Sequence, residues 1–168
     1  MLMTSRSFRS SGALLARFVL AALLLFATAR FAAAAETAGQ IVAKAIIEDD
    51  SEKKATLITS LIGNPDPQII PLFDAWKGDV IYLYKAEGSE VKIPVLVTGE
   101  KDADDKQAAT RVDDGQPLKD AEGKPLKIVA SDYDAAEHDS LIRGSMKEVR
   151  DLLALVAPDR DARVGAIR

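Results

Sequence analysis

The sequence predicts a mainly α-helical fold with β-hairpin insertions. Apolar residues recur at helical spacing between residues 37 and 77, the spacing changes to that of β-strands after Gly78, and helical spacing returns from Ile142. The strand-like part extends from about residue 80 to about residue 130. We therefore expect one or two β-hairpins to interrupt an otherwise helical domain.

Three short helices are expected before the change of spacing. Apolar stripes run from Ile41 to Ile46 and from Leu57 to Ile62, with Ser51 as the candidate N-cap of the second helix. A third helix is expected to start at Asp66-Pro67, with aspartate as N-cap and proline where its missing N–H costs nothing. Because the turn at Gly63-Asn64 is short, the second and third helices are predicted to form an antiparallel hairpin.

Two β-hairpins are expected next. Val80–Tyr84 and Val91–Val97 are rich in β-branched and aromatic residues, and Pro94 assigns the second of them to a sheet edge. The acidic segment Thr98–Thr110 has no periodicity and is interpreted as an exposed loop. Pro-Leu-Lys then occurs at 117–119 and at 125–127, which predicts a second hairpin.

A closing helix follows on the apolar stripe from Ile142 to Val156. Ala157-Pro158-Asp159 then repeats the earlier Asn64-Pro65-Asp66, and Arg160–Arg168 is expected to begin another helix. Two successions of helix, Pro-Asp turn and helix are typical of stacked helical hairpins of the HEAT kind. Because the chain stops inside the last of these helices, we expect the domain to be truncated at its C-terminal end.

The N-terminal residues predict export. Three arginines, the last at Arg17, precede the apolar run Phe18–Ala29, and a tract of alanines at 32–35 follows, which is the order of a secretory signal. We expect residues 1–35 to be a signal peptide cleaved after Ala35 and residues 36–168 to be periplasmic. The alternative is an uncleaved anchor, although this run is shorter than the roughly 20 residues that a membrane span needs.

Charge and composition exclude several classes of function. Cleavage after Ala35 removes four arginines, so 22 minus 4 leaves 18 basic against 26 acidic side chains and a net charge of −8. Such an acidic surface argues against a nucleic-acid partner. The absence of cysteine excludes disulfides, thiol nucleophiles and Cys-ligated metal, and the absence of a Gly-rich phosphate loop argues against direct ATP binding. No cofactor is expected.

The sequence gives little support for a catalytic or metal-binding site. His138 is the single histidine, and its neighbours Asp139 and Ser140 are interpreted as a helix start that one of them caps rather than as a catalytic triad. One histidine without cysteine argues against zinc. The acidic loop Asp102–Asp105 lacks the glycine and glutamate of an EF-hand and is interpreted as solvated charge. No catalytic, cofactor-binding or metal-ligating residue is assigned.

Three aromatic residues at the helix-to-strand change are candidates for a protein contact. Trp76, Tyr82 and Tyr84 lie close together in the sequence, and tryptophan and tyrosine are favoured interface anchors. The alternative is a small core that pins the β-hairpin to the third helix. The sequence leaves both interpretations open.

The order of motifs resembles a known family. NPDPQIIPLFDAW, GDVIYLYK, DDGQPLKDAEGKPL and EVRDLLALVAPDRDARVGAI follow one another as in the N-terminal extracytoplasmic region of urea ABC transporter permease subunits, and the resemblance covers nearly everything after the signal. These permeases are similar to branched-chain amino-acid permeases and carry a secreted helical-repeat region, interrupted by a β-ribbon, ahead of their membrane helices. The chain departs from the family at Glu137–Gly144, where the family has an Arg-rich, Asn-containing stretch, and it lacks the multi-span permease.

The resemblance implies a part in urea uptake. Urea would be captured by a separate periplasmic binding protein and would cross the membrane subunits at the expense of ATP hydrolysed in the cytoplasm. It assigns no catalytic or urea-binding residue to this segment. The leading hypothesis is a non-catalytic periplasmic segment, associated with the inner membrane if joined to a permease, that docks or positions the membrane subunits and the urea-binding protein.

Two other hypotheses stay open. One is a free-standing secreted HEAT-like adaptor, and an open reading frame after Arg168 that encodes apolar spans of about 20 residues would favour the permease over it. The other is a secreted hydrolase that uses scattered carboxylates, which would need a concave pocket with perturbed acids.

Overall fold

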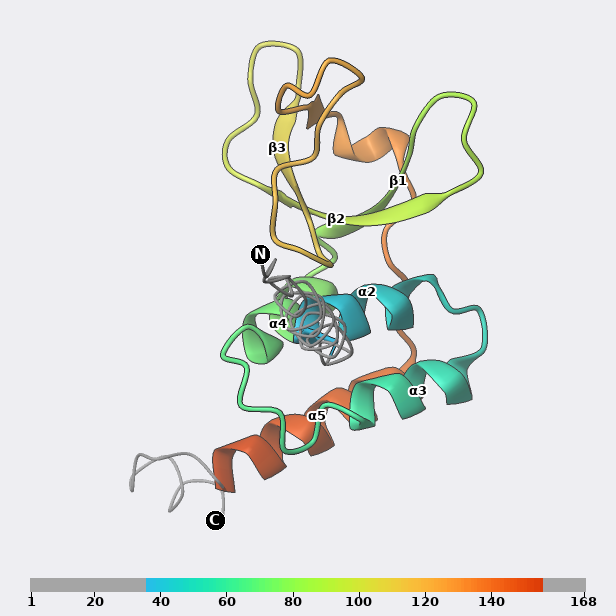
Figure 1. Ribbon diagram of the computed structural model, residues 1–168, viewed down its shortest axis with the longest axis vertical. Coiled ribbons are helices and arrows are strands. Elements are labelled where there is room, and N and C mark those ends of the chain that lie inside the picture. Colours follow the sequence, from blue (N-terminus) through green and yellow to red (C-terminus); the bar gives the residue numbers. More distant parts are fainter. Residues whose placement is uncertain (1–35, 156–168) are drawn as a thin grey trace, which may run out of the picture. The chain divides into compact units, whose positions relative to one another are not determined.

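The computed structural model describes residues 36–155. The predicted signal at 1–35 and the helix predicted at Arg160–Arg168 lie outside these residues. The described part is mixed α/β, with four α-helices in one layer and a curled four-stranded antiparallel sheet in the other (Figure 1). The predicted combination of helices and β-hairpins is present, whereas a mainly α-helical fold is not confirmed.

Side chains cap the starts of three of the four helices of the described part, whereas the third helix begins without a side-chain cap. α2 (Ala38–Ile47) starts with a capping box between Thr37 and Gln40. The N-cap of α3 (Ser51–Thr59) is Asp50, whose carboxylate accepts hydrogen bonds from two backbone N–H groups, so the prediction of Ser51 as N-cap was wrong by one residue. The N-cap of α4 (Ile69–Lys77) is Gln68, so the prediction of Asp66 as N-cap was wrong by two residues, and Asp66 instead accepts a hydrogen bond from the N–H of Gln68 in the turn before the helix. α5 (Ser140–Leu155) is the predicted closing helix.

The packing of the helices differs from the predicted hairpins. α3 packs mainly against α2 and α5, so the antiparallel pairing of α3 with α4 and the HEAT-like stacking are not confirmed. α3 does not pair with α4 because α5, which lies much later in the sequence, covers the apolar side of α3. The hydroxyl of Ser51 donates to the carboxylate of Asp139 at 2.8 Å and links the starts of α3 and α5.

One apolar core holds the helical layer together. Its fully buried side chains come from all four helices and from the start of the sheet, and the largest of them are Val42, Ile58, Leu61, Ile69, Phe73, Trp76, Ile81, Ile142, Met146 and Val149. Most residues of the stripes predicted from periodicity therefore face this core, whereas Ile62 and Leu152 are 41% and 37% exposed and Val156 lies outside the described residues. None of the helices between residues 36 and 155 has both the length and the apolar character that crossing a membrane requires.

The strands are ordered β1-β2-β3-β4 along the sheet. β1 (Ile81–Lys85) and β2 (Lys92–Thr98) form the predicted first hairpin, with Ile81 opposite Leu96. β3 (Gln107–Arg111) pairs with β2, and the short β4 (Lys127–Ile128) pairs with β3. A second core of Val95, Val97, Ala109, Leu118 and Ile128 is buried in this sheet.

Two predictions about the sheet were wrong for one reason. Thr98–Thr110 was expected to be loop because it has no periodicity, but pairing with β2 and β4 makes Gln107–Arg111 a strand, which includes the last four residues of that segment. β2 is therefore central, and Pro94 does not mark an edge. The structure accommodates Pro94 because pairing with β3 begins one residue later, at Val95, while the Pro94 carbonyl accepts a hydrogen bond from Val112 N–H at 3.0 Å.

The second predicted hairpin is present and attached to the sheet. Leu118 and Leu126 are joined by a backbone hydrogen bond of 2.7 Å, and the turn between them is closed by a bond from Asp120 N–H to the Lys124 carbonyl. The N–H of Leu118 also donates to the carbonyl of Ala109 in β3. This ribbon therefore extends the sheet surface beside β3.

A crossover segment, residues 133–139, connects the sheet to α5. It follows the 3-10 turn Ala130–Asp132 and runs along the outer side of β1, where Leu83 N–H donates to the Asp134 carbonyl and Ala136 N–H to the Ile81 carbonyl, both at 2.8 Å. These bonds cover part of the free edge of β1. The crossover segment thus lies where the helical layer meets the sheet.

The joint between α4 and β1 is a Schellman turn. Asp79 N–H donates to the Trp76 carbonyl and Val80 N–H to the Ala75 carbonyl. The left-handed position is taken by Asp79, with φ of 55°, and not by its neighbour Gly78, with φ of −87°. The predicted change of spacing at Lys77–Asp79 is therefore a helix stop that redirects the chain into β1.

Asp79→Gly is expected to be more stable than Asp79→Ala by about 1 kcal/mol, because alanine has a steric penalty in the left-handed conformation and glycine has none. Both variants remove the same carboxylate, so their difference isolates the backbone effect. Urea unfolding followed by circular dichroism measures it. Equal stability of the two variants would contradict a left-handed Asp79.

Candidate docking groove

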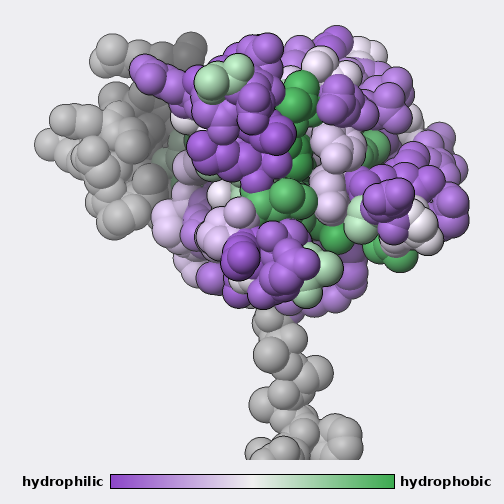
Figure 2. All heavy atoms as spheres, turned by 90° about the horizontal axis from the view of Figure 1, so that it is seen from above, coloured by the Kyte–Doolittle hydropathy of each residue, from purple (hydrophilic) through white to green (hydrophobic). Residues whose placement is uncertain are grey.

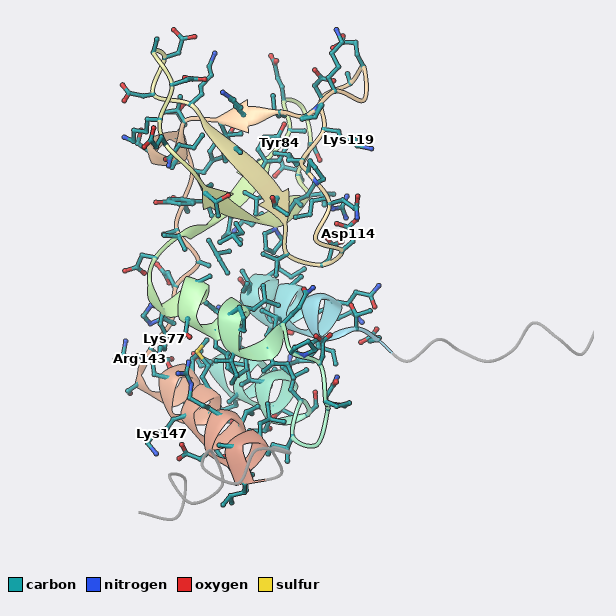
Figure 3. The ribbon with its side chains drawn as sticks, turned by 90° about the vertical axis from the view of Figure 1, so that its left-hand side faces the viewer. Lys77, Tyr84, Asp114, Lys119, Arg143 and Lys147 are labelled. Atoms are coloured by element: carbon teal, nitrogen blue, oxygen red, sulfur yellow. The ribbon has the colours of Figure 1, made fainter. Side chains whose placement is uncertain are left out.

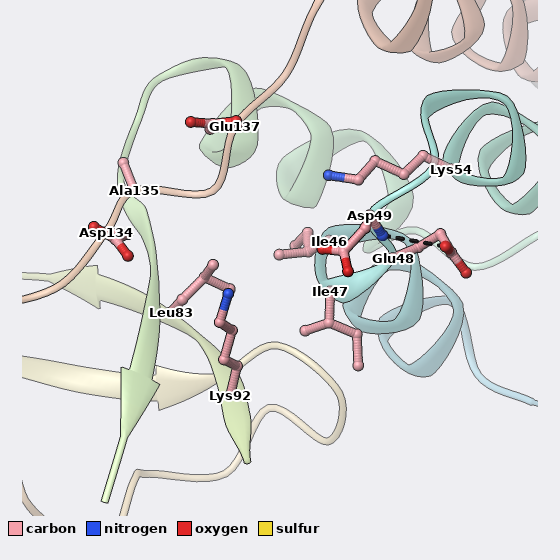
Figure 4. Close-up of a pocket in the computed structure, with 10 residues that line it drawn as sticks. All are labelled: Ile46, Ile47, Glu48, Asp49, Lys54, Leu83, Lys92, Asp134, Ala135 and Glu137. Atoms are coloured by element: carbon pink, nitrogen blue, oxygen red, sulfur yellow. Dashed lines mark hydrogen bonds between the residues drawn. The ribbon is translucent and has the colours of Figure 1, made fainter. Parts of the chain in front are cut away.

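A groove of about 400 Å³ lies between the C-terminal end of α2, the β1–β2 hairpin and the crossover segment (Figure 4). Ile46 and Ile47 face Leu83 across it. Ile46 is buried, Leu83 is half-buried, and Ile47 is 46% exposed. The floor of the groove is therefore apolar and partly open to solvent.

Charged side chains form the walls of the groove. Asp49, Asp134 and Glu137 line it together with Lys54 and Lys92. Among residues 36–155, none of these five side chains has an oppositely charged partner within 4.0 Å. The groove thus carries charges that the fold itself does not neutralise by direct pairing.

A second hollow of about 420 Å³ continues the groove toward the starts of α3 and α5. The two share Asp49, Lys54 and Glu137. Together they are lined by six acids and two lysines, a net of −4 with His138 neutral; the acids are Glu48, Asp49, Asp79, Asp134, Glu137 and Asp139. We call the two hollows together the acidic groove.

His138 is held between an acid and an arginine. Its Nδ1 lies 3.2 Å from Nη1 of Arg143, which only donates, so Nδ1 accepts and the neutral ring carries its proton on Nε2. Nε2 is buried and lies 3.4 Å from Oδ1 of Asp79, outside hydrogen-bond geometry. In the described part of the chain, neither ring nitrogen meets a hydroxyl, so His138 does not form the triad considered from the sequence.

Asp139 caps α5. The sequence had predicted that either Asp139 or Ser140 would cap this helix. Its Oδ1 accepts a hydrogen bond from the N–H of Ile142 at 2.9 Å, and its Oδ2 accepts one from the Ser51 hydroxyl. The Ile142 bond, followed by the Ser51 bond, lowers the pKa of Asp139 below its usual value. The carboxylate is therefore ionised at neutral pH and acts as an acceptor, not as a proton donor.

Acid is expected to weaken the fold through Asp139. A carboxylate with a lower pKa in the folded than in the unfolded chain stabilises the fold above its unfolded pKa of about 3.9 and loses that effect as the pH falls through the folded value. Asp139→Asn keeps an acceptor but does not titrate. Urea unfolding at pH 7 and pH 3 gives the free energy of unfolding of the wild type and the variant. We expect the difference between the two proteins to be smaller at pH 3, and an unchanged difference would exclude Asp139 as the titrating group.

The predicted contact residues occupy two environments. Trp76 is fully buried, and its Nε1–H donates to the carbonyls of Ala136 and Glu137 at 3.1 and 3.3 Å, so it is the core residue that the alternative interpretation described. Tyr82 and Tyr84 are half-buried against the core of the sheet. The structure therefore gives no exposed surface to Trp76 and some to the two tyrosines.

Tyr84 also borders a cleft of about 510 Å³ on the sheet, between the β1–β2 hairpin and the ribbon that begins at Gln116. Asp114 and Lys119 lie on its rim (Figure 3). The ring of Tyr84 is 5.3 Å from that of Tyr133, whose pKa is raised by burial. Seen from the sheet end, apolar side chains show between hydrophilic loops (Figure 2).

One carboxylate of the acidic loop Asp102–Asp105 has a structural role. Asp102 accepts hydrogen bonds from the N–H groups of Asp104 and Lys106 and pairs with Lys127 at 3.1 Å, and these contacts lower its pKa, the Lys106 bond most. Within residues 36–155, no group of three or more histidine and acidic side chains is placed to hold a metal ion.

Sequence reasoning missed the acidic groove because its sides come from distant segments. Glu48 and Asp49 follow α2, Lys92 starts β2, and Asp134 and Glu137 belong to the crossover segment. The one local signal is Ile47, which extends the apolar run of α2 beyond the face that Ile46 buries.

Comparisons with protein-family models, with curated proteins and with solved structures found no match.

Proposed function

We propose that residues 36–155 belong to the non-catalytic, periplasmic N-terminal segment of a urea ABC transporter permease, and that this segment contributes to urea uptake by docking or positioning transporter components. The order of elements supports the proposal. α4, β1 and the ribbon at 117–126 lie in segments whose sequences resemble that family, and the second half of α5 begins the last of these segments.

The observation that carries the docking role is the acidic groove. Its floor contains the exposed Ile47, and five charged side chains on its walls have no ion-pair partner in the described residues, namely Asp49, Lys54, Lys92, Asp134 and Glu137. Surfaces with unpaired charge around an apolar centre suit protein contacts whose formation is fast and sensitive to salt. A component of the transporter that docks and leaves during uptake would need such a contact.

The finer fold is part of the same proposal. Leu152 and Leu155, near the end of α5, are 37% and 40% exposed. A further helical pair stacked against this end of α5 would bury them, as neighbouring repeats do in HEAT-like proteins. We therefore propose that α3 and α5 form the first unit of a longer helical stack in the intact permease.

A pull-down tests the docking role. The full chain, tagged at its C-terminus, is immobilised and offered the periplasmic urea-binding protein and, separately, the remaining permease subunits in detergent. We expect one of them to be retained at about 20 mM salt and released at about 500 mM, where screening shortens the range of surface charges. Retention of neither at low salt would contradict the proposal.

A further inference from the structure

We infer that the acidic groove binds an extended segment of a partner protein that carries lysine or arginine beside an aliphatic side chain. This inference rests on the proposed docking function, since it names the chemistry of the partner at that site.

The charges of the groove favour a basic segment. Asp49 reaches the groove from the α2–α3 connection, while Asp134 and Glu137 reach it from the crossover segment. All three side chains are exposed, and none accepts a hydrogen bond within the described residues, so none is needed to hold a turn or a cap. They differ in this from Glu48 and Asp139, whose carboxylates bind backbone N–H groups.

The floor of the groove favours an aliphatic side chain between the charges. Ile47 is 46% exposed between the buried Ile46 and the half-buried Leu83. Covering such a side chain removes apolar surface from water, at about 25 cal/mol per Å². A small cation or a polyamine would satisfy the acids but would leave this floor uncovered.

Two lysines determine which segments fit. Lys54 and Lys92 enter the same groove (Figure 4), and they oppose a ligand that is cationic along its whole length. They can pair with backbone carbonyls or with an acid of the partner, which sets its register. The groove therefore favours a polypeptide of mixed character with a basic excess.

The test is a selection of random twelve-residue peptides displayed on phage against the immobilised, C-terminally tagged full chain. We expect the enriched peptides to carry a basic excess and at least one leucine, isoleucine or valine. Synthetic copies of the enriched peptides then give dissociation constants by fluorescence polarisation.

A matched pair of variants locates the binding. Asp134→Lys with Glu137→Lys changes the charge by +4 in the groove, and Glu87→Lys with Glu122→Lys makes the same change in two exposed turns. We expect the first variant to weaken binding at least tenfold and the second by less than about twofold, consistent with a local electrostatic contact. Ile47→Thr is expected to weaken binding without any change of charge. Circular dichroism checks that each variant is folded.

Four outcomes would overturn the inference. The first two are enriched peptides without a basic excess and no enrichment at all. The others are equal weakening of binding by the two charge variants and full competition by spermidine, which would mean that charge alone determines binding. The pull-down separates this inference from the proposed function. If the transporter component is still retained by Asp134→Lys with Glu137→Lys, docking stands and the groove is not its site. If peptides bind but no component is retained, the groove stands and the proposed function falls.

Discussion

Replacing Trp76 by alanine is expected to lower the free energy of unfolding by about 3–5 kcal/mol, the usual loss when a large buried aromatic side chain is removed. The indole is fully buried in the core shared by the four helices and the start of β1. Its N–H also donates to the carbonyls of Ala136 and Glu137, so the substitution leaves buried acceptors of the crossover segment without that donor. Since a small domain has roughly 5–15 kcal/mol in total, this loss would remove a large part of the stability of the fold.

The measurement is urea unfolding followed by circular dichroism, because Trp76 is the only tryptophan and the variant has no indole fluorescence. Trp76→Phe separates packing from hydrogen bonding, since it keeps most of the apolar volume and loses the N–H. We expect it to cost about 1–3 kcal/mol, the range for a buried polar group left without its partner. A loss under 1 kcal/mol for Trp76→Ala would mean that Trp76 does not join α4 to the crossover segment.

Local patterns predict the elements of this fold well. The helical stripe that ends in Ile46 faces the core, as do Ile142, Met146 and Val149 of the last stripe, and the first β-hairpin has the predicted strands within one residue. Both signals come from residues close in sequence, whose spacing determines which face of an element is apolar. The change from helix to strand at Lys77–Asp79 is visible for the same reason.

What the sequence does not predict depends on contacts between distant segments. Gln107–Arg111 is a strand only because β2 and β4 lie on either side of it, and its own propensity is low. In the same way α3 packs against α5, which follows it by some 80 residues, instead of forming a hairpin with α4. Both features depend on tertiary contacts, which local periodicity does not predict. The repeat pattern therefore predicted α4, and not α5, as the helix that packs against α3.

The acidic groove shows the same limit for function. Its acids are ordinary surface residues in the sequence, and the crossover segment acquires a role only because hydrogen bonds from Leu83 and Ala136 hold it against β1 beside the end of α2. Trp76 adds a third attachment from α4. Residues that stabilise the crossover segment therefore also position Asp134 and Glu137, and loss of Trp76 is expected to disturb the groove as well as the core.

Gly39→Ala is expected to destabilise the protein by about 1–3 kcal/mol, the usual cost of forcing extra volume into a packed site. A Cβ at Gly39 would lie 2.5 Å from the Val112 carbonyl oxygen and 3.0 Å from that of Asp113. Both atoms belong to the backbone of the turn after β3, so the helical layer and the sheet would have to separate for the methyl group to fit.

Gly144→Ala is the matched control for Gly39→Ala, because a Cβ there meets no atom within 4 Å and both glycines lie in helices. Alanine has the higher helix propensity, so Gly144→Ala should stabilise the protein by roughly 0.5–1 kcal/mol. Thermal and urea unfolding of the two variants compare the same chemical change in a packed and an open site. Stabilisation by both substitutions would show that α2 does not pack closely against the Val112–Asp113 turn in solution, and opposite signs would establish that contact as the joint between the two layers.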